Sequence, residues 1–180
     1  HGPARPLTSG STISTARSPH GSQIVYANTG FNSQLWRLKV KPNEGKAAGE
    51  MEPLPHSGGS EYAPSSSADG RLLAYLQSSP AGHSVHLRNL ATAGDSLLLN
   101  SWGRPKLSPD GSKVAYSVWS ESIHLIPSGG GESTALVPAQ ANTSMQVREW
   151  TADGKKIIYW IGPPFRWVML DVETRVATEL

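Results

Sequence analysis

The segment Ser108-Pro109-Asp110-Gly111-Ser112-Lys113-Val114-Ala115-Tyr116 decides the fold, because close variants of it occur at three other places in the chain. The related segments are 18–26 (SPHGSQIVY), 67–75 (SADGRLLAY) and 151–159 (TADGKKIIY). The shared glycines, at positions 21, 70, 111 and 154, are spaced 49, 41 and 43 residues apart. A period in this range is typical of proteins built from stacked structural repeats.

Each of these segments predicts a tight turn followed by a strand. Proline presets the backbone angle at the second position of a type I turn, and an Asp carboxylate accepts nearby backbone N–H groups. Glycine then adopts the left-handed conformation at little steric cost. The apolar run that follows ends in Tyr26, Tyr75, Tyr116 and Tyr159, and such short runs are typical of strands buried on both faces.

Further strands surround each turn. We expect a strand before it at 12–17, 61–66, 102–107 and 145–150, and another after the apolar run at 34–40, 84–90, 122–126 and 167–171. Third runs such as 96–99 and 132–137 follow a polar bend. Four short antiparallel strands make one propeller blade. The 14 prolines and 18 glycines argue against long helices, so the sequence predicts an all-β protein.

The repeated phrase resembles the repeat of TolB-type β-propellers, which are related in shape to Trp-Asp repeat propellers. In that family a Trp typically precedes the Ser, and Trp150 fits this pattern. The other three places depart from it, with Leu107, Ser66 and Arg17, and His20 replaces Asp in the first repeat. The resemblance implies a propeller over residues 12–180, with blades at about 12–56, 61–100, 102–138 and 145–180. Residues 1–11 are then an N-terminal extension or a tag remnant.

The number of blades in the native ring stays open. Propellers have four to eight blades, and the TolB-type family more often has six or more. We therefore expect one of two arrangements: the four blades close alone, or they form part of a larger ring that a second copy or missing blades complete. The start at His1, without an initiator Met, and the end on a strand favour a fragment.

Composition narrows the range of partners. The 16 basic and 14 acidic residues give a net charge of +2, and no run of Lys and Arg has the length of a nucleic-acid patch. The absence of cysteine excludes disulfides and thiolate chemistry. No apolar segment approaches 18 residues, so we expect no membrane insertion. The family resemblance implies an extracytoplasmic location, either periplasmic or secreted.

Catalytic signatures are weak in this sequence. No Gly-x-Ser-x-Gly nucleophile elbow occurs. His83 and His86 are three residues apart in a predicted strand, where their side chains point to opposite faces, so we expect no metal site and no cofactor. Asp69, Asp110 and Asp153 lie in equivalent turns of different blades, where turn stabilisation explains them better than acid–base catalysis. We expect no catalysis by this chain on its own.

Aromatic residues are the more informative signal. The four in-phase tyrosines are predicted to pack between blades. Phe31, Trp119, Trp160 and Phe165 are out of phase and fall in or beside the loops that join second and third strands. Trp102 is predicted to begin a strand close to the same face, and Arg104, Arg148 and Arg166 offer polar contacts there. These side chains either cap the blade ends or form a partner-binding face.

The preferred interpretation is therefore a non-catalytic propeller that serves as a scaffold for a protein or peptide. One alternative is an accessory, substrate-gating propeller of a larger hydrolase of the prolyl-oligopeptidase or amidohydrolase kind. Another is the sensory domain of a regulator or kinase. All three are analogies from fold to function, because function resides in sites placed on folds.

Overall fold

The structure is a computed structural model that describes residues 12–17, 23–28, 33–41, 44–56, 58–118 and 121–180 of the chain. These residues form 16 strands, which pair into four antiparallel sheets of four strands each. No helix occurs among them. The predicted all-β fold of four four-stranded blades is therefore confirmed.

In every sheet the four strands are neighbours in chain order, as in a blade made of successive hairpins. The first sheet contains β1 (Thr12–Arg17), β2 (Gln23–Asn28), β3 (Gln34–Lys41) and β4 (Lys46–Pro53). The second contains β5 (Ser60–Ser66), β6 (Leu72–Ser79), β7 (Gly82–Asn89) and β8 (Asp95–Asn100).

The third and fourth sheets repeat this order with shorter outer strands. The third contains β9 (Lys106–Leu107), β10 (Lys113–Val118), β11 (Ser122–Pro127) and β12 (Thr134–Val137). The fourth contains β13 (Ser144–Trp150), β14 (Lys156–Gly162), β15 (Arg166–Asp171) and β16 (Ala177–Glu179).

One predicted strand is wrong over most of its length. Residues 102–107 were expected to form a strand beginning at Trp102, but only Lys106 and Leu107 pair with β10. Two features of the segment explain this: Gly103 weakens a strand, and Pro105 has no N–H for a ladder. Trp102 and Arg104 therefore lie in an irregular connection.

The three described Asp-Gly turns have the predicted geometry. In each one the glycine N–H donates to the carbonyl three residues earlier, as from Gly111 to Ser108 at 2.9 Å. The glycines at 70, 111 and 154 have φ of 71°, 75° and 69°. In the central turn the Asp110 carboxylate accepts the Ser108 hydroxyl at 2.6 Å and the Ser112 backbone N–H at 3.0 Å. The Asp side chains therefore stabilise the turns of these hairpins.

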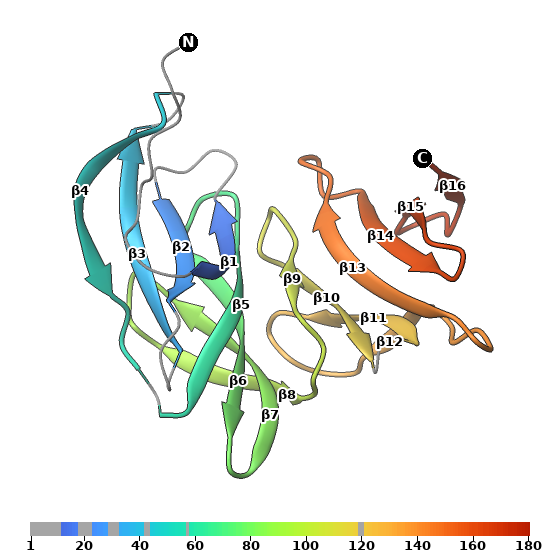
Figure 1. The fold of residues 1–180 in the computed structure, drawn as a ribbon, viewed down its shortest axis with the longest axis horizontal. Helices are drawn as coiled ribbons and strands as arrows, with labels where there is room; N and C mark the ends of the chain where they lie inside the picture. The colour runs from blue at the N-terminus through green and yellow to red at the C-terminus, as the bar shows by residue number, and fades with distance from the viewer. Residues whose placement is uncertain (1–11, 18–22, 29–32, 42–43, 57, 119–120) are drawn as a thin grey trace.

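The four sheets are arranged one after another around a common centre, with one edge strand of each sheet innermost. Figure 1 shows β1, β5, β9 and β13 toward the centre and β4 and β16 at opposite outer sides. The inner strand of each sheet contacts the sheet before it: β5 contacts β1–β3, β9 contacts β5 and β6, and β13 contacts β9–β11. This radial order is the arrangement of propeller blades.

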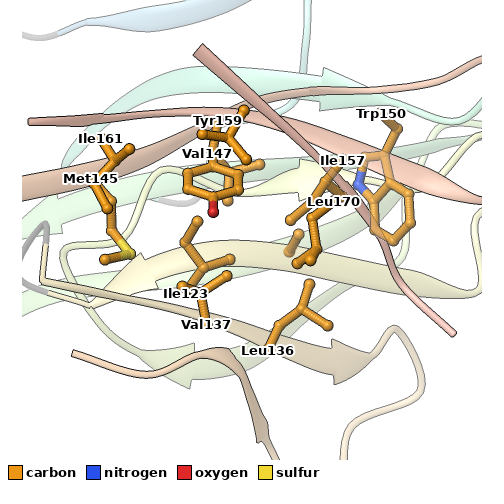
Figure 2. Packing of buried hydrophobic residues seen from close by; sticks show 12 residues of the cluster. Ile123, Leu136, Val137, Met145, Val147, Trp150, Ile157, Tyr159, Ile161 and Leu170 are labelled. Atoms are coloured by element: carbon orange, nitrogen blue, oxygen red, sulfur yellow. The ribbon is translucent and has the colours of Figure 1, made fainter. Parts of the chain in front are cut away.

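Apolar side chains fill the spaces between neighbouring sheets. The largest cluster lies between the third and fourth sheets, where Ile123, Leu136 and Val137 face Met145, Tyr159 and Leu170 (Figure 2). Tyr75, Tyr116 and Tyr159 are all buried in such interfaces, as the repeat phase predicted. Packing between the sheets removes these apolar side chains from water. Burial of apolar surface is the main favourable contribution to the free energy of folding.

Hydrogen bonds fix each sheet against the next. The Ser65 hydroxyl accepts the Leu107 N–H at 2.9 Å, and the Ser117 hydroxyl accepts the Val147 N–H at 3.0 Å. The Trp150 indole N–H donates to the Lys106 carbonyl at 2.8 Å. These contacts satisfy buried inner-strand groups that would otherwise lack a partner at a sheet junction.

The arc of sheets does not close within the described residues, because no substantial contact joins the first sheet to the fourth. Among the described residues, no other sheet covers the outward face of the fourth sheet. When the sheets are aligned on Tyr75, Tyr116 and Tyr159, Trp167 takes the place of Val85 and Ile123. Those two residues are fully buried, whereas Trp167 is 47% exposed.

Candidate functional site

The connection between β8 and β9 is a rigid loop that presents side chains in two directions. The Gly103 N–H donates to the Ser101 hydroxyl at 3.0 Å. Gly103 and Pro105 are buried, while Trp102 and Arg104, which alternate with them along the chain, are exposed. Only glycine fits at position 103, because a Cβ there would collide with the Ser117 carbonyl and the Tyr116 ring.

On one side of this loop, Trp102 forms the wall of an aromatic pocket. The indole stacks on the imidazole of His83 and is 56% exposed. His83 Nδ1 lies 3.0 Å from the Tyr62 hydroxyl, so the base of the stack is held in place. The remaining lining comes from Leu99, Asn100, Ser101, Tyr116 and Val118. Sequence reasoning selected Trp102 and missed His83 as its partner, because the two rings meet only where the chain after β8 continues alongside β7, with the Ser101 N–H donating to the His83 carbonyl at 3.1 Å.

On the other side, the loop contributes to a basic pocket where three inner strands meet. Its lining comes from β5, from the approach to β9 and from β13, and consists of Ala63, Pro64, Arg104, Pro105, Lys106, Gln146, Val147 and Arg148. We call this the basic pocket, because three of these side chains are cationic. It brings together Arg104 and Arg148, two of the three arginines predicted from sequence.

The other predicted residues lie elsewhere. Trp160 and Phe165 contact each other edge to face, with centroids 5.3 Å apart at the β14–β15 hairpin. Arg166 follows them and pairs with Glu179, Nε to Oε2 at 3.9 Å. Phe31 and Trp119 lie outside the described residues. The predicted set is thus spread over the basic pocket, the aromatic pocket and the tip of the fourth sheet.

A buried charged cluster between the first two sheets was not predicted. Arg88 is 1% exposed, and its Nη2 lies 2.9 Å from Glu61 Oε1, 2.6 Å from Asp95 Oδ2 and 2.7 Å from the Tyr75 hydroxyl. Burial by itself lowers the pKa of Arg88, but hydrogen bonds with Glu61 and Asp95 outweigh it and raise the pKa. Arg88 therefore stays charged, and its ion pairs with Glu61 and Asp95 link β7 to β5 and β8.

Beside this cluster, a serine, a histidine and an aspartate of the second sheet contact one another in that order. Ser84 Oγ lies 3.0 Å from His86 Nε2, and His86 Nδ1 lies 3.5 Å from Asp95 Oδ1. The third sheet repeats the first contact, with Ser122 Oγ 3.2 Å from His124 Nε2. Since Asp95 is bound to Arg88 and Tyr75, and the Ser-x-His pair recurs beside a tyrosine in two sheets, a packing role explains it.

No group of three or more His, Asp or Glu side chains in the described part of the chain is arranged to hold a metal ion. The described residues also contain no helix with the length and hydropathy that membrane crossing requires.

Solved structures with a similar arrangement include β-propellers, among them TolB. TolB from Acinetobacter baumannii superposes with a TM-score of 0.75 at 19% identity over 95% of this chain. The Cps50 (Swd1) propeller domain of Myceliophteria thermophila gives 0.65 at 14% identity over 97%. A structure from a study of two prolyl endopeptidases gives 0.61 at 17% identity over 94%. No protein-family model and no curated protein matches the chain.

The chain spans less than two thirds of each of these structures. It covers 43% of the TolB chain, 57% of the Cps50 domain and 28% of the prolyl endopeptidase. The likeness at this level of identity establishes the β-propeller fold. The same fold occurs in proteins with very different roles, so function has to be argued from the sites.

Proposed function

We propose that this chain is a non-catalytic propeller module that binds a protein or peptide partner. The observation that supports this most is the rigid loop at 101–105, which exposes a Trp and an Arg over adjacent pockets. Trp and Arg are the residues most enriched among binding hot spots. A rigid loop also loses little conformational entropy when a partner binds.

The proposal can be tested by selecting peptides on the purified chain. Random 12-residue peptides displayed on phage are panned, and the affinity of enriched sequences is measured by fluorescence anisotropy. We expect Trp102→Ala to weaken binding at least about tenfold, the size expected of a hot-spot residue. Leu97→Ala is the matched control, because Leu97 is 57% exposed on the neighbouring strand β8.

Two outcomes would count against this function. One is that no peptide is enriched by panning. The other is that Trp102→Ala and Leu97→Ala change affinity equally, which would place binding away from the loop. Melting curves of both variants should stay close to the wild type, since both side chains are more than half exposed.

A hydrolase role is the alternative that one observation favours. The fold is shared with a prolyl endopeptidase structure. In this chain Ser84 contacts His86, and His86 contacts Asp95. If this chain were catalytic, it would hydrolyse p-nitrophenyl acetate and Ser84→Ala would abolish the activity. We expect no Ser84-dependent turnover, in which case a hydrolase role requires a separate catalytic domain that this propeller would serve as an accessory.

We also propose that the ring is completed by further sheets and that the protein acts outside the cytoplasm. The exposed Trp167 at a position buried in two other sheets supports the first point. The TolB-type fold supports the second by analogy. Fractionation of cells that express the full gene tests the location, and cytoplasmic recovery would contradict it.

A further inference from the structure

The basic pocket carries an inference that deepens the proposed function and rests on it: we propose that this pocket binds carboxylates of an acidic peptide. Three cationic side chains, Arg104, Lys106 and Arg148, converge there from two separate segments. Two features indicate the kind of partner: the ion pairs that these three cations already make, and the backbone irregularities beside them.

The charges of the pocket are only partly neutralised. Lys106 Nζ lies 3.5 Å from Glu149 Oε2, which is an exposed pair. Arg148 donates from Nη1 to the neutral Gln146 Oε1 at 2.9 Å. No carboxylate oxygen of the described residues lies within 4.0 Å of the Arg104 or Arg148 guanidinium. Two guanidinium groups are therefore available to an incoming anion.

Backbone irregularities in two different strands coincide at this pocket. The pairing of β5 shifts register between Tyr62 and Ser65, where Ala63 has a φ of 52°. The pairing of β13 shifts between Val147 and Glu149, so Arg148 is the extra residue. Bulges redirect side chains and are over-represented beside functional sites. A non-glycine residue in the left-handed region is uncommon and often marks such a site.

The remaining lining suits a polypeptide. Ala63, Pro64, Pro105 and Val147 form uncharged walls, and the two prolines restrict backbone motion. Arginine recognises carboxylates through paired N–H···O bonds. A nucleic acid would instead require a broad basic surface that follows many phosphates. The net charge of +2 and the small number of cations in the pocket favour one or two carboxylates.

The contribution of Arg104 is also visible in its surroundings. Burial raises the pKa of the Tyr62 hydroxyl, and the positive charge of Arg104 opposes that rise. Tyr62 in turn contacts His83 under Trp102. The basic pocket and the aromatic pocket are therefore neighbours, and a single peptide could place an aromatic or apolar residue at one and an acidic residue at the other.

The test uses fluorescein-labelled hexaglutamate with a blocked C-terminus and the purified full chain, with binding followed by anisotropy. Blocked hexalysine is the charge control, and hexaglycine with a free C-terminus distinguishes a terminal carboxylate from side-chain carboxylates. The variant Arg104→Gln/Arg148→Gln should weaken hexaglutamate binding at least about tenfold. The matched control, Arg71→Gln/Lys155→Gln, removes the same charge from exposed turn residues that do not line the pocket and should change binding less than about twofold.

The possible results distinguish failure of the carboxylate site from failure of the proposed peptide binding. Absence of hexaglutamate binding, or an equal loss in both double variants, would overturn the proposal that the pocket binds an acidic peptide. If panned peptides bind through Trp102 but lack acidic residues and are not displaced by hexaglutamate, peptide binding stands and the carboxylate inference falls. Binding of hexaglycine but not of blocked hexaglutamate would assign the pocket to a C-terminal carboxylate.

Discussion

The buried cluster around Arg88 gives the sharpest test of how this propeller is held together. Arg88 and Glu61 are 1% and 0% exposed, and they join β7 to β5. In Arg88→Leu the Glu61 carboxylate loses the guanidinium that compensates its burial. Removing one partner of a buried ion pair costs about 3–5 kcal/mol. For a domain of this size that corresponds to a melting temperature lower by roughly 6–20 °C.

The fourth sheet shows what the same positions look like without charge. By strand pairing, Met145, Leu170 and Ala177 stand where the second sheet has Glu61, Arg88 and Asp95. A variant carrying Glu61→Met, Arg88→Leu and Asp95→Ala removes all the charges together, and Tyr75→Phe removes the hydroxyl that they bind. Replacing a whole buried ionic group by apolar residues is often neutral.

We therefore expect the quadruple variant to be more stable than Arg88→Leu, and within about 2 kcal/mol of the wild type. Urea denaturation followed by tryptophan fluorescence measures both values. A near-wild-type stability for Arg88→Leu would refute the reasoning, because it would mean that the Glu61 carboxylate does not need its partner. A quadruple variant no better than the single one would show that side-chain shape, and not charge, sets the stability of this interface.

Three further predictions concern the sheet junctions, the turns and the open face. Ser117→Ala leaves the buried Val147 N–H without its acceptor and should cost about 1–3 kcal/mol in urea denaturation; the exposed Ser96→Ala is the control, and an equal effect of both would contradict the role. Asp110→Ala should lower stability at neutral pH and spare peptide binding. Hydrogen bonds from Ser108 and Ser112 lower the pKa of Asp110 below its ordinary 3.8, so the contribution of this carboxylate is present above that value and is lost as the pH falls through the lowered pKa. The loss caused by Asp110→Ala should therefore vanish in acid, and a constant difference from pH 7 to pH 2 would argue against it. Trp167→Lys/Met169→Lys should reduce self-association in sedimentation velocity without lowering the melting temperature, whereas Leu97→Lys should leave association unchanged; a wild-type chain that stays monomeric at all concentrations would mean that this face does not attract another sheet.

The turns and strands of the fold were predictable because they depend on local chemistry. Each Asp-Gly hairpin repeats the same short-range bonds, so the four sheets follow from a pattern visible in one dimension. The failure at Trp102 has a local cause as well. Gly103 and Pro105 interrupt the ladder, so Trp102 lies exposed in an irregular loop and not in a strand.

The sites were less predictable, because they combine residues that are distant along the chain. Arg104 and Arg148 could be chosen individually as cations near a loop, but their shared pocket depends on where sheets three and four meet. The role of Arg88 gave no signal, since an Arg in an alternating strand is normally assigned to the solvent face. Its partner Glu61 looks equally ordinary in the sequence. Only the folded sheet, in which β5 and β7 lie on either side of β6, shows that the two side chains meet in the interior.

The repeat nevertheless contains a signal that could have found this cluster. In a propeller, equivalent positions meet equivalent surroundings, so a charged residue where other blades have apolar ones must bring its own partner. Arg88 stands where the fourth sheet has Leu170, and Glu61 stands where it has Met145. Two exceptions of opposite charge in one blade therefore predict a pair. The same comparison identifies Trp167, where an exposed aromatic replaces Val85 and Ile123. In both cases the departure from the repeat, and not the repeat itself, indicates what is particular to this protein.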